Sequence, residues 1–73
     1  MKRIKYEVEI TYDEEVDMGY IYLVPIKNGE VTSIKGEYPI LYDVNKEHQI
    51  LGIEIFDASS IFPDKIKELL DKN

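Results

Sequence analysis

The stretch from Ile50 to Lys72, ILGIEIFDASSIFPDKIKELLDK, contains a predicted strand followed directly by a predicted helix. Over 50–56 the apolar residues Leu51, Ile53 and Ile55 alternate with Gly52 and Glu54, and this period of two indicates a strand. The residues after it have the spacing of a helix. A strand that leads into one C-terminal helix predicts an α+β domain.

The predicted helix covers about 60–71. Ile66, Leu69 and Leu70 stand three and four residues apart, with Phe62 one turn earlier, which is the spacing of one apolar stripe that packs on a sheet. Residues of types that cap helix N-termini precede this stripe: Asp57, Ser59 and Ser60. Pro63 suits the first helical turn.

Working outward toward the N-terminus, the pattern predicts an antiparallel sheet of about five strands, mostly in meander order. The first segment alternates apolar and charged residues over nine positions, with Tyr6 and Tyr12 on its apolar face. Tyr42 falls on the core face of the later strand over 38–44. Asn28-Gly29 is a hairpin signal, and the short polar strand after it is expected at an edge. The expected strands are about 3–12, 18–25, 30–34, 38–44 and 50–56.

The 73 residues form one domain, 1–73, with 44% hydrophobic and 33% charged residues. Nine Lys and Arg against fifteen Asp and Glu give a net charge of −6, which argues against binding to nucleic acid or to an anionic membrane. A basic partner protein is electrostatically compatible. With no cysteine and no targeting segment or membrane span in view, we expect a cytoplasmic location.

The acidic connector over 13–17 is the densest group of potential metal ligands, with Asp13, Glu14, Glu15 and Asp17. Carboxylates bind Ca²⁺ and Mg²⁺, yet the spacing is not that of an EF-hand loop. We therefore expect a solvated turn, in which Asp13 bonds the backbone two residues on, and no metal or other cofactor. The alternative is that Asp13 and Asp17 act as the acid and the base of a catalytic pair.

Six tyrosines are many for this length, and the second strand carries two of them. Tyr20 and Tyr22 lie on one face of that strand, and Ile21 and Leu23 lie on the other. One short helix protects one side of a sheet, so one of these pairs is expected to remain uncovered. These four residues are the interaction candidates, either for a subunit interface or for a small ligand.

Two stretches of the chain resemble a family of short prokaryotic proteins catalogued as domain of unknown function 2283, over about residues 10–60. The first stretch contains Tyr12-Asp13, Asp17 and Tyr20-Ile21-Tyr22-Leu23, and the second contains Asp43 and the run from Ile50 to Ser59. The motif residues within them are Tyr12, Asp13, Asp17, Asp43, Gly52, Glu54, Asp57 and Ser59. The resemblance implies the same fold and brings no established activity, so the role of these residues is unknown. Genes for such proteins sometimes neighbour those of toxin-like proteins, which implies an antitoxin-like role as one option.

The turn before the last strand departs from that family, because His48 stands where a glycine is usual and Asn45 where an acid is usual. The position calls for a left-handed backbone, which histidine tolerates. We therefore predict a left-handed His48. We assign no catalytic role to His48, the only histidine, or to Glu54 and Asp57.

The leading interpretation is a non-enzymatic protein-interaction module that acts as a homodimer. The first alternative is a small hydrolase, either metal-dependent or acid/base, that uses the acidic connector. Further alternatives are an antitoxin-like binder of a basic protein and a small-ligand binder through the tyrosine face.

Overall fold

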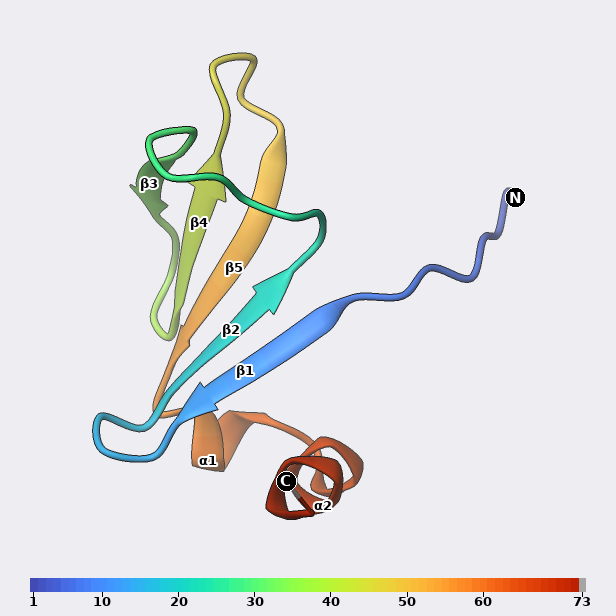
Figure 1. The fold of residues 1–73 in the computed structure, drawn as a ribbon, viewed down its shortest axis with the longest axis vertical. Helices are drawn as coiled ribbons and strands as arrows, with labels where there is room; N and C mark the ends of the chain where they lie inside the picture. The colour runs from blue at the N-terminus through green and yellow to red at the C-terminus, as the bar shows by residue number, and fades with distance from the viewer. Residues whose placement is uncertain (73) are drawn as a thin grey trace.

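The computed structural model describes residues 1–72 and contains one five-stranded antiparallel sheet followed by two short helices (Figure 1). The strands lie in the order β1-β2-β5-β4-β3. Their bounds are β1 Glu9–Asp13, β2 Met18–Tyr22, β3 Thr32–Lys35, β4 Ile40–Val44 and β5 Ile50–Phe56, and the helices are α1 Ala58–Ile61 and α2 Asp64–Asp71. The predicted α+β class and the predicted five-stranded, meander-like antiparallel sheet are confirmed.

The last strand occupies the middle of the sheet. β5 pairs with β2 on one side and with β4 on the other, while β1 and β3 form the two edges. The short polar β3 is exposed throughout, as expected for an edge strand. Three of the four neighbouring pairs join strands that are consecutive in the chain, and only the pairing of β2 with β5 is not sequential.

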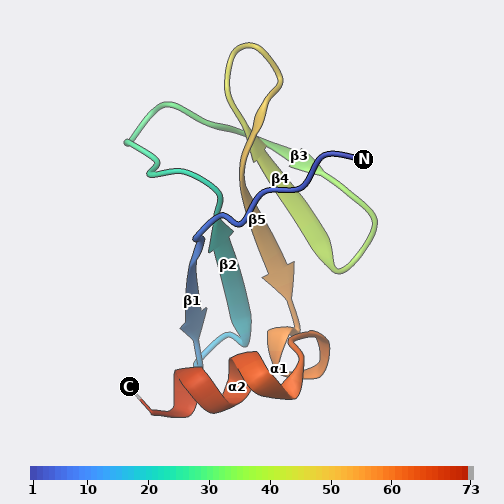
Figure 2. The same cartoon turned by 90° about the vertical axis from the view of Figure 1, so that its right-hand side faces the viewer.

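The helical region differs from the single predicted helix over 60–71. Phe62 and Pro63 have extended backbones and separate α1 from α2, so Pro63 stands immediately before the second helix rather than inside a continuous one. α2 lies across the end of the sheet where β1 ends (Figure 2). Asp57 precedes α1 in a left-handed conformation, but its side chain makes no capping hydrogen bond.

The core lies between this end of the sheet and the helices. It centres on Ile55, Ala58 and Phe62, and the partly buried residues that pack against it are Ile10, Tyr12, Ile21, Ile53, Ile66 and Leu70. Gly19 permits the closest approach, because a Cβ atom there would overlap the ring of Phe62. Two of the three residues of the predicted helical stripe therefore reach the core, whereas Leu69 stays half exposed.

The predicted first strand over 3–12 is wrong in its first half. Pairing begins only at Glu9, opposite Tyr22, and no strand within residues 1–72 pairs with residues 1–8. The reason is the length of β2, which ends at Tyr22 and leaves those residues no neighbour. Tyr6, predicted on a core face, is therefore exposed.

The Asn28-Gly29 turn forms, but the hairpin predicted around it does not. Gly29 has a φ of 82°, and the amide of Glu30 donates to the carbonyl of Lys27 at 3.2 Å. The strands on either side of the turn do not pair with each other, since β2 pairs with β1 and β5. A local turn signal fixes the turn and not the partners of the flanking strands.

The turn between β4 and β5 contains the left-handed residue predicted from the sequence. His48 has a φ of 63°, which confirms the prediction. Its amide donates to the carbonyl of Asn45 at 3.0 Å, and the Asn45 side chain accepts the amide hydrogens of Glu47 and Gln49. A side chain with a Cβ is therefore held in a conformation that favours glycine.

We expect His48→Gly to raise the free energy of unfolding by a few tenths to about 1 kcal/mol, because it relieves the left-handed strain at this position. Urea unfolding measures the change. Lys46→Gly is the matched control, since that residue lies exposed in the same turn and has no positive φ to relieve. A destabilised His48→Gly protein would show that the imidazole itself supports the turn.

Candidate functional site

The first polar cluster of the molecule lies where the turn between β1 and β2 meets α1. Within this turn the Asp13 carboxylate accepts the amide hydrogen of Glu15 at 3.0 Å, which is the predicted local turn bond. Asp17, the last residue of the turn, has a φ of 53°. That backbone conformation directs the Asp17 carboxylate toward the beginning of α1.

The Asp17 carboxylate binds three donors. Its Oδ1 accepts the Tyr12 hydroxyl at 2.8 Å and the Ser59 amide at 2.8 Å, and its Oδ2 accepts the Ser59 hydroxyl at 2.7 Å. The Asp17 carbonyl also accepts the amide hydrogen of Ala58 at 3.0 Å. The Asp17 carboxylate thus caps α1 from a position 42 residues before Ser59, in place of Asp57, one of the three capping candidates in the sequence.

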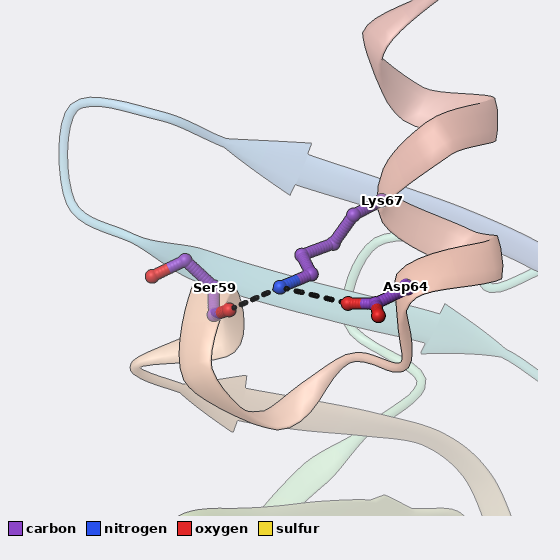
Figure 3. Close-up of polar contacts among 3 residues, drawn as sticks. All are labelled: Ser59, Asp64 and Lys67. Atoms are coloured by element: carbon purple, nitrogen blue, oxygen red, sulfur yellow. Dashed lines mark hydrogen bonds and ion pairs between the residues drawn. The ribbon is translucent and has the colours of Figure 1, made fainter.

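Lys67 contacts the backbone carbonyl of the same serine (Figure 3). The Lys67 ammonium donates to the Ser59 carbonyl at 3.3 Å and lies 3.5 Å from the Asp64 carboxylate. These contacts join the carbonyl end of α1 to the first turn of α2. Ser59 therefore has its amide, hydroxyl and carbonyl groups all engaged.

The hydrogen bonds of this cluster change the acidity of its members. The Ser59 hydroxyl, followed by the Ser59 amide and the Tyr12 hydroxyl, lowers the pKa of the Asp17 carboxyl. The hydrogen bond to Asp17 raises the pKa of Tyr12. Both shifts favour the charged carboxylate beside a neutral phenol, which suits a fixed structural contact.

We expect Asp17→Asn to lower the melting temperature at neutral pH, and the difference from the wild type to shrink in acid. A carboxyl with a lowered pKa in the folded state contributes stability above its unfolded pKa, about 3.9, and loses it as the pH falls through the folded value. Thermal unfolding between pH 7 and pH 2 measures the difference. Glu14→Gln in the same turn is the control, and an equal effect of the two variants would contradict this role.

The second polar cluster lies on the sheet face away from the helices and centres on Asp43. This residue is only 8% exposed and is the fourth of the five residues of β4. The Tyr20 hydroxyl donates to its Oδ2, and the Ser33 hydroxyl donates to its Oδ1 at 2.6 Å. A buried carboxylate is thus satisfied by two hydroxyl groups from β2 and β3.

Gly52 leaves room for the Tyr20 side chain to reach Asp43. Gly52 lies on β5 directly opposite both Tyr22 and Asp43, between the strands that carry the phenol and the carboxylate. A Cβ atom at this position would overlap the phenol of Tyr20. The missing side chain therefore lets the ring cross the central strand.

The position of Tyr20 beside Asp43 changes the pKa of its hydroxyl. Burial, followed by the hydrogen bond to Asp43, raises the pKa of Tyr20 well above its ordinary value. The charge of Glu54, which faces Tyr20 across the strands, acts in the same direction. Tyr22 packs beside Tyr20 with ring centroids 4.5 Å apart.

The four interaction candidates of the second strand are all partly buried. Ile21 packs against the core on the helix side, whereas Tyr20 and Tyr22 cover the opposite face. Tyr22 and Leu23 also line a hollow of about 520 Å³. Its other residues come from the N-terminal segment and from the chain after β2: Tyr6, Glu7, Val8, Glu9, Val24, Pro25 and Ile26.

The family model described as "Protein of unknown function (DUF2283)" matches residues 9–59 of the chain. The chain belongs to the DUF2283 family. No curated protein and no solved structure matches it in the same comparisons. DUF2283 membership agrees with the resemblance noted from the sequence and carries no activity with it.

Five of the eight motif residues of the DUF2283 resemblance belong to the two clusters. Tyr12, Asp17 and Ser59 form the first, and Asp43 and Gly52 belong to the second, while Asp13, Glu54 and Asp57 lie beside them in sequence. Sequence reasoning missed Ser33 and Lys67, whose contacts cross between elements. The sequence contains no signal for these two residues. It contains one for Asp43, which is an acid within an otherwise apolar strand.

Within residues 1–72, no three or more acidic or histidine side chains are grouped so that they could hold a metal ion. The turn between β4 and β5, which carries His48, lies at the end of the sheet opposite the helices (Figure 1), away from both Asp13 and Asp17. Neither helix of the described chain is long and apolar enough to cross a membrane.

Proposed function

We propose that the chain is a non-enzymatic protein-interaction module that acts as a homodimer in the cytoplasm. One observation carries the proposal: a group of exposed apolar side chains lies outside the core, at the N-terminal end. Ile4, Tyr6 and Val8 are 81%, 59% and 41% exposed, and Val24 is exposed beside the same hollow. Exposed apolar side chains gathered at one end of a molecule favour an interaction site there.

The polar clusters support a non-enzymatic role because their reactive groups already have partners. Both oxygens of Asp17 accept hydrogen bonds, and so do both oxygens of Asp43. An acid or base in catalysis needs an oxygen that faces its substrate. These carboxylates instead tie the helices to the sheet and the edge strand to its neighbours.

Self-association also fits the size of the core. Only four apolar residues are buried among residues 1–72: Val44, Ile55, Ala58 and Phe62. A single core of this size leaves a margin of only about 3–5 kcal/mol. A second copy that covers the N-terminal apolar surface adds stability that rises with protein concentration.

Light scattering at tens of micromolar tests the homodimer, with an expected mass of twice 8.6 kDa. Tyr22→Glu and Leu23→Glu place a charge in the hollow and are expected to shift the protein toward monomer. Val16→Glu is the matched control, because Val16 is an exposed apolar residue in the turn at the far end of β1. A monomeric wild type at these concentrations would overturn the homodimer.

A further inference from the structure

Residues 1–8 lead away from the start of β1 and extend beyond the sheet (Figure 1). Within residues 1–72, their backbone groups take part in no strand pairing and no backbone hydrogen bond. Among residues 1–72, one side-chain hydrogen bond ties the segment to the domain: the Tyr6 hydroxyl donates to the Leu23 carbonyl at 2.6 Å. The protein therefore presents a segment that alternates like a strand and has unpaired backbone groups, which is a template for pairing with another chain.

The charges of this strand change sign at its middle. Arg3 and Lys5 precede Tyr6, and Glu7 and Glu9 follow it, at equal spacing on the face opposite the apolar side chains. In an antiparallel pair, residues that lie directly opposite each other share a face and interact. The strand is thus complementary in charge to a reversed copy of itself.

The two-fold register centred on Tyr6 uses this complementarity most fully, because it pairs all four charges. With Tyr6 opposite Tyr6 of the partner subunit, Lys5 faces Glu7 of the partner subunit and Arg3 faces Glu9 of the partner subunit. Shifting the centre by one residue places Lys5 or Glu7 opposite its own copy, which is unfavourable. A parallel in-register pair places like charges together at every charged position.

We infer that two copies of this chain pair antiparallel through residues 3–9, with the two-fold axis at Tyr6. The inference rests on the proposed homodimer and names its interface. Each protomer contributes the same strand, as a closed two-fold interface requires. Ile4 then faces Val8 of the partner subunit, so the exposed apolar face is shared between the two copies.

Charge reversal tests the register. Lys5→Glu and Glu7→Lys each place like charges across the axis, and each is expected to weaken self-association by about tenfold or more. The two variants change the net charge from −6 to −8 and to −4 respectively. A simple effect of net charge would therefore move their affinities in opposite directions.

Mixing the two variants restores the complementarity. In the mixed pair, the glutamate introduced at position 5 of one chain faces the lysine introduced at position 7 of the other. The native Glu7 of the first chain faces the native Lys5 of the second, so an equimolar mixture is expected to form heterodimers of near wild-type affinity. Far-ultraviolet circular dichroism of each variant checks its fold, which these exposed positions do not support. Two variants that stay monomeric when mixed would overturn the register.

A disulfide provides a second readout, because the natural chain contains no cysteine. Directly opposed residues of an antiparallel pair have Cα atoms about 4.5–5.5 Å apart, which suits a disulfide. Tyr6→Cys is expected to oxidise rapidly to a covalent dimer, and Val16→Cys, at a similarly exposed site, slowly. Equal rates would overturn this interface; a wild type that is still dimeric would then keep the proposed function, and a monomeric one would not.

Discussion

Phe62→Ala is expected to leave most of the chain unfolded at room temperature. Phe62 is only 5% exposed and joins α1 to the sheet through Ala58 and Gly19. Truncation of a buried phenylalanine costs about 3–5 kcal/mol, which is the whole margin of a disulfide-free domain of this size. Urea unfolding followed by circular dichroism measures the loss.

Ile61→Ala is the control for this prediction, because it removes a comparable apolar side chain from the neighbouring position of α1. Ile61 is about half exposed, so its truncation is expected to cost about 1 kcal/mol. Phe62→Leu keeps an apolar side chain and brings the loss into the measurable range. Similar stability of the Phe62→Ala and Ile61→Ala proteins would show that the core does not centre on this ring.

Tyr20→Phe is expected to lower the free energy of unfolding by about 1–2 kcal/mol, because it removes one of the two hydroxyl donors of the buried Asp43 carboxylate. Tyr22→Phe is the matched control on the same strand face. Its hydroxyl has no hydrogen bond within residues 1–72, and its loss is expected to cost less than about 0.5 kcal/mol.

Gly52→Ala tests the same contact from the central strand. Its methyl group displaces the Tyr20 phenol and removes the bond to Asp43, so the variant is expected to be destabilised in the wild-type background. In a Tyr20→Ala background the obstruction is gone, and the cost of Gly52→Ala is expected to fall. Equal costs in both backgrounds would show that the ring and the glycine are independent.

Alternation predicted the sheet well because it reports which residues share a face. It placed Ile40, Tyr42 and Val44 together, and it placed the bounds of β5 as the structure has them. It could not identify strand partners. Residues 3–8 alternate as clearly as β5, yet no strand among residues 1–72 pairs with them, since an amphipathic pattern does not specify what covers it.

The polar clusters were beyond single-sequence reasoning for a related reason. The acidic connector was correctly expected to bond locally at Asp13, because that bond spans two residues. The bond from Ser59 to Asp17 spans 42 residues and exists only because β2 and β5 are adjacent. Without the order of the strands, Asp57 was the natural choice for the helix cap.

The central place of β5 has a consequence for synthesis of the protein on the ribosome. Until Ile50–Phe56 has emerged, the nascent chain contains only the pairs β1–β2 and β3–β4, which do not contact each other through strand pairing. An isolated two-stranded hairpin is marginal in water. Folding of the sheet must therefore wait for β5, and a product that stops before Ile50 is expected to be degraded rather than to accumulate as a folded fragment.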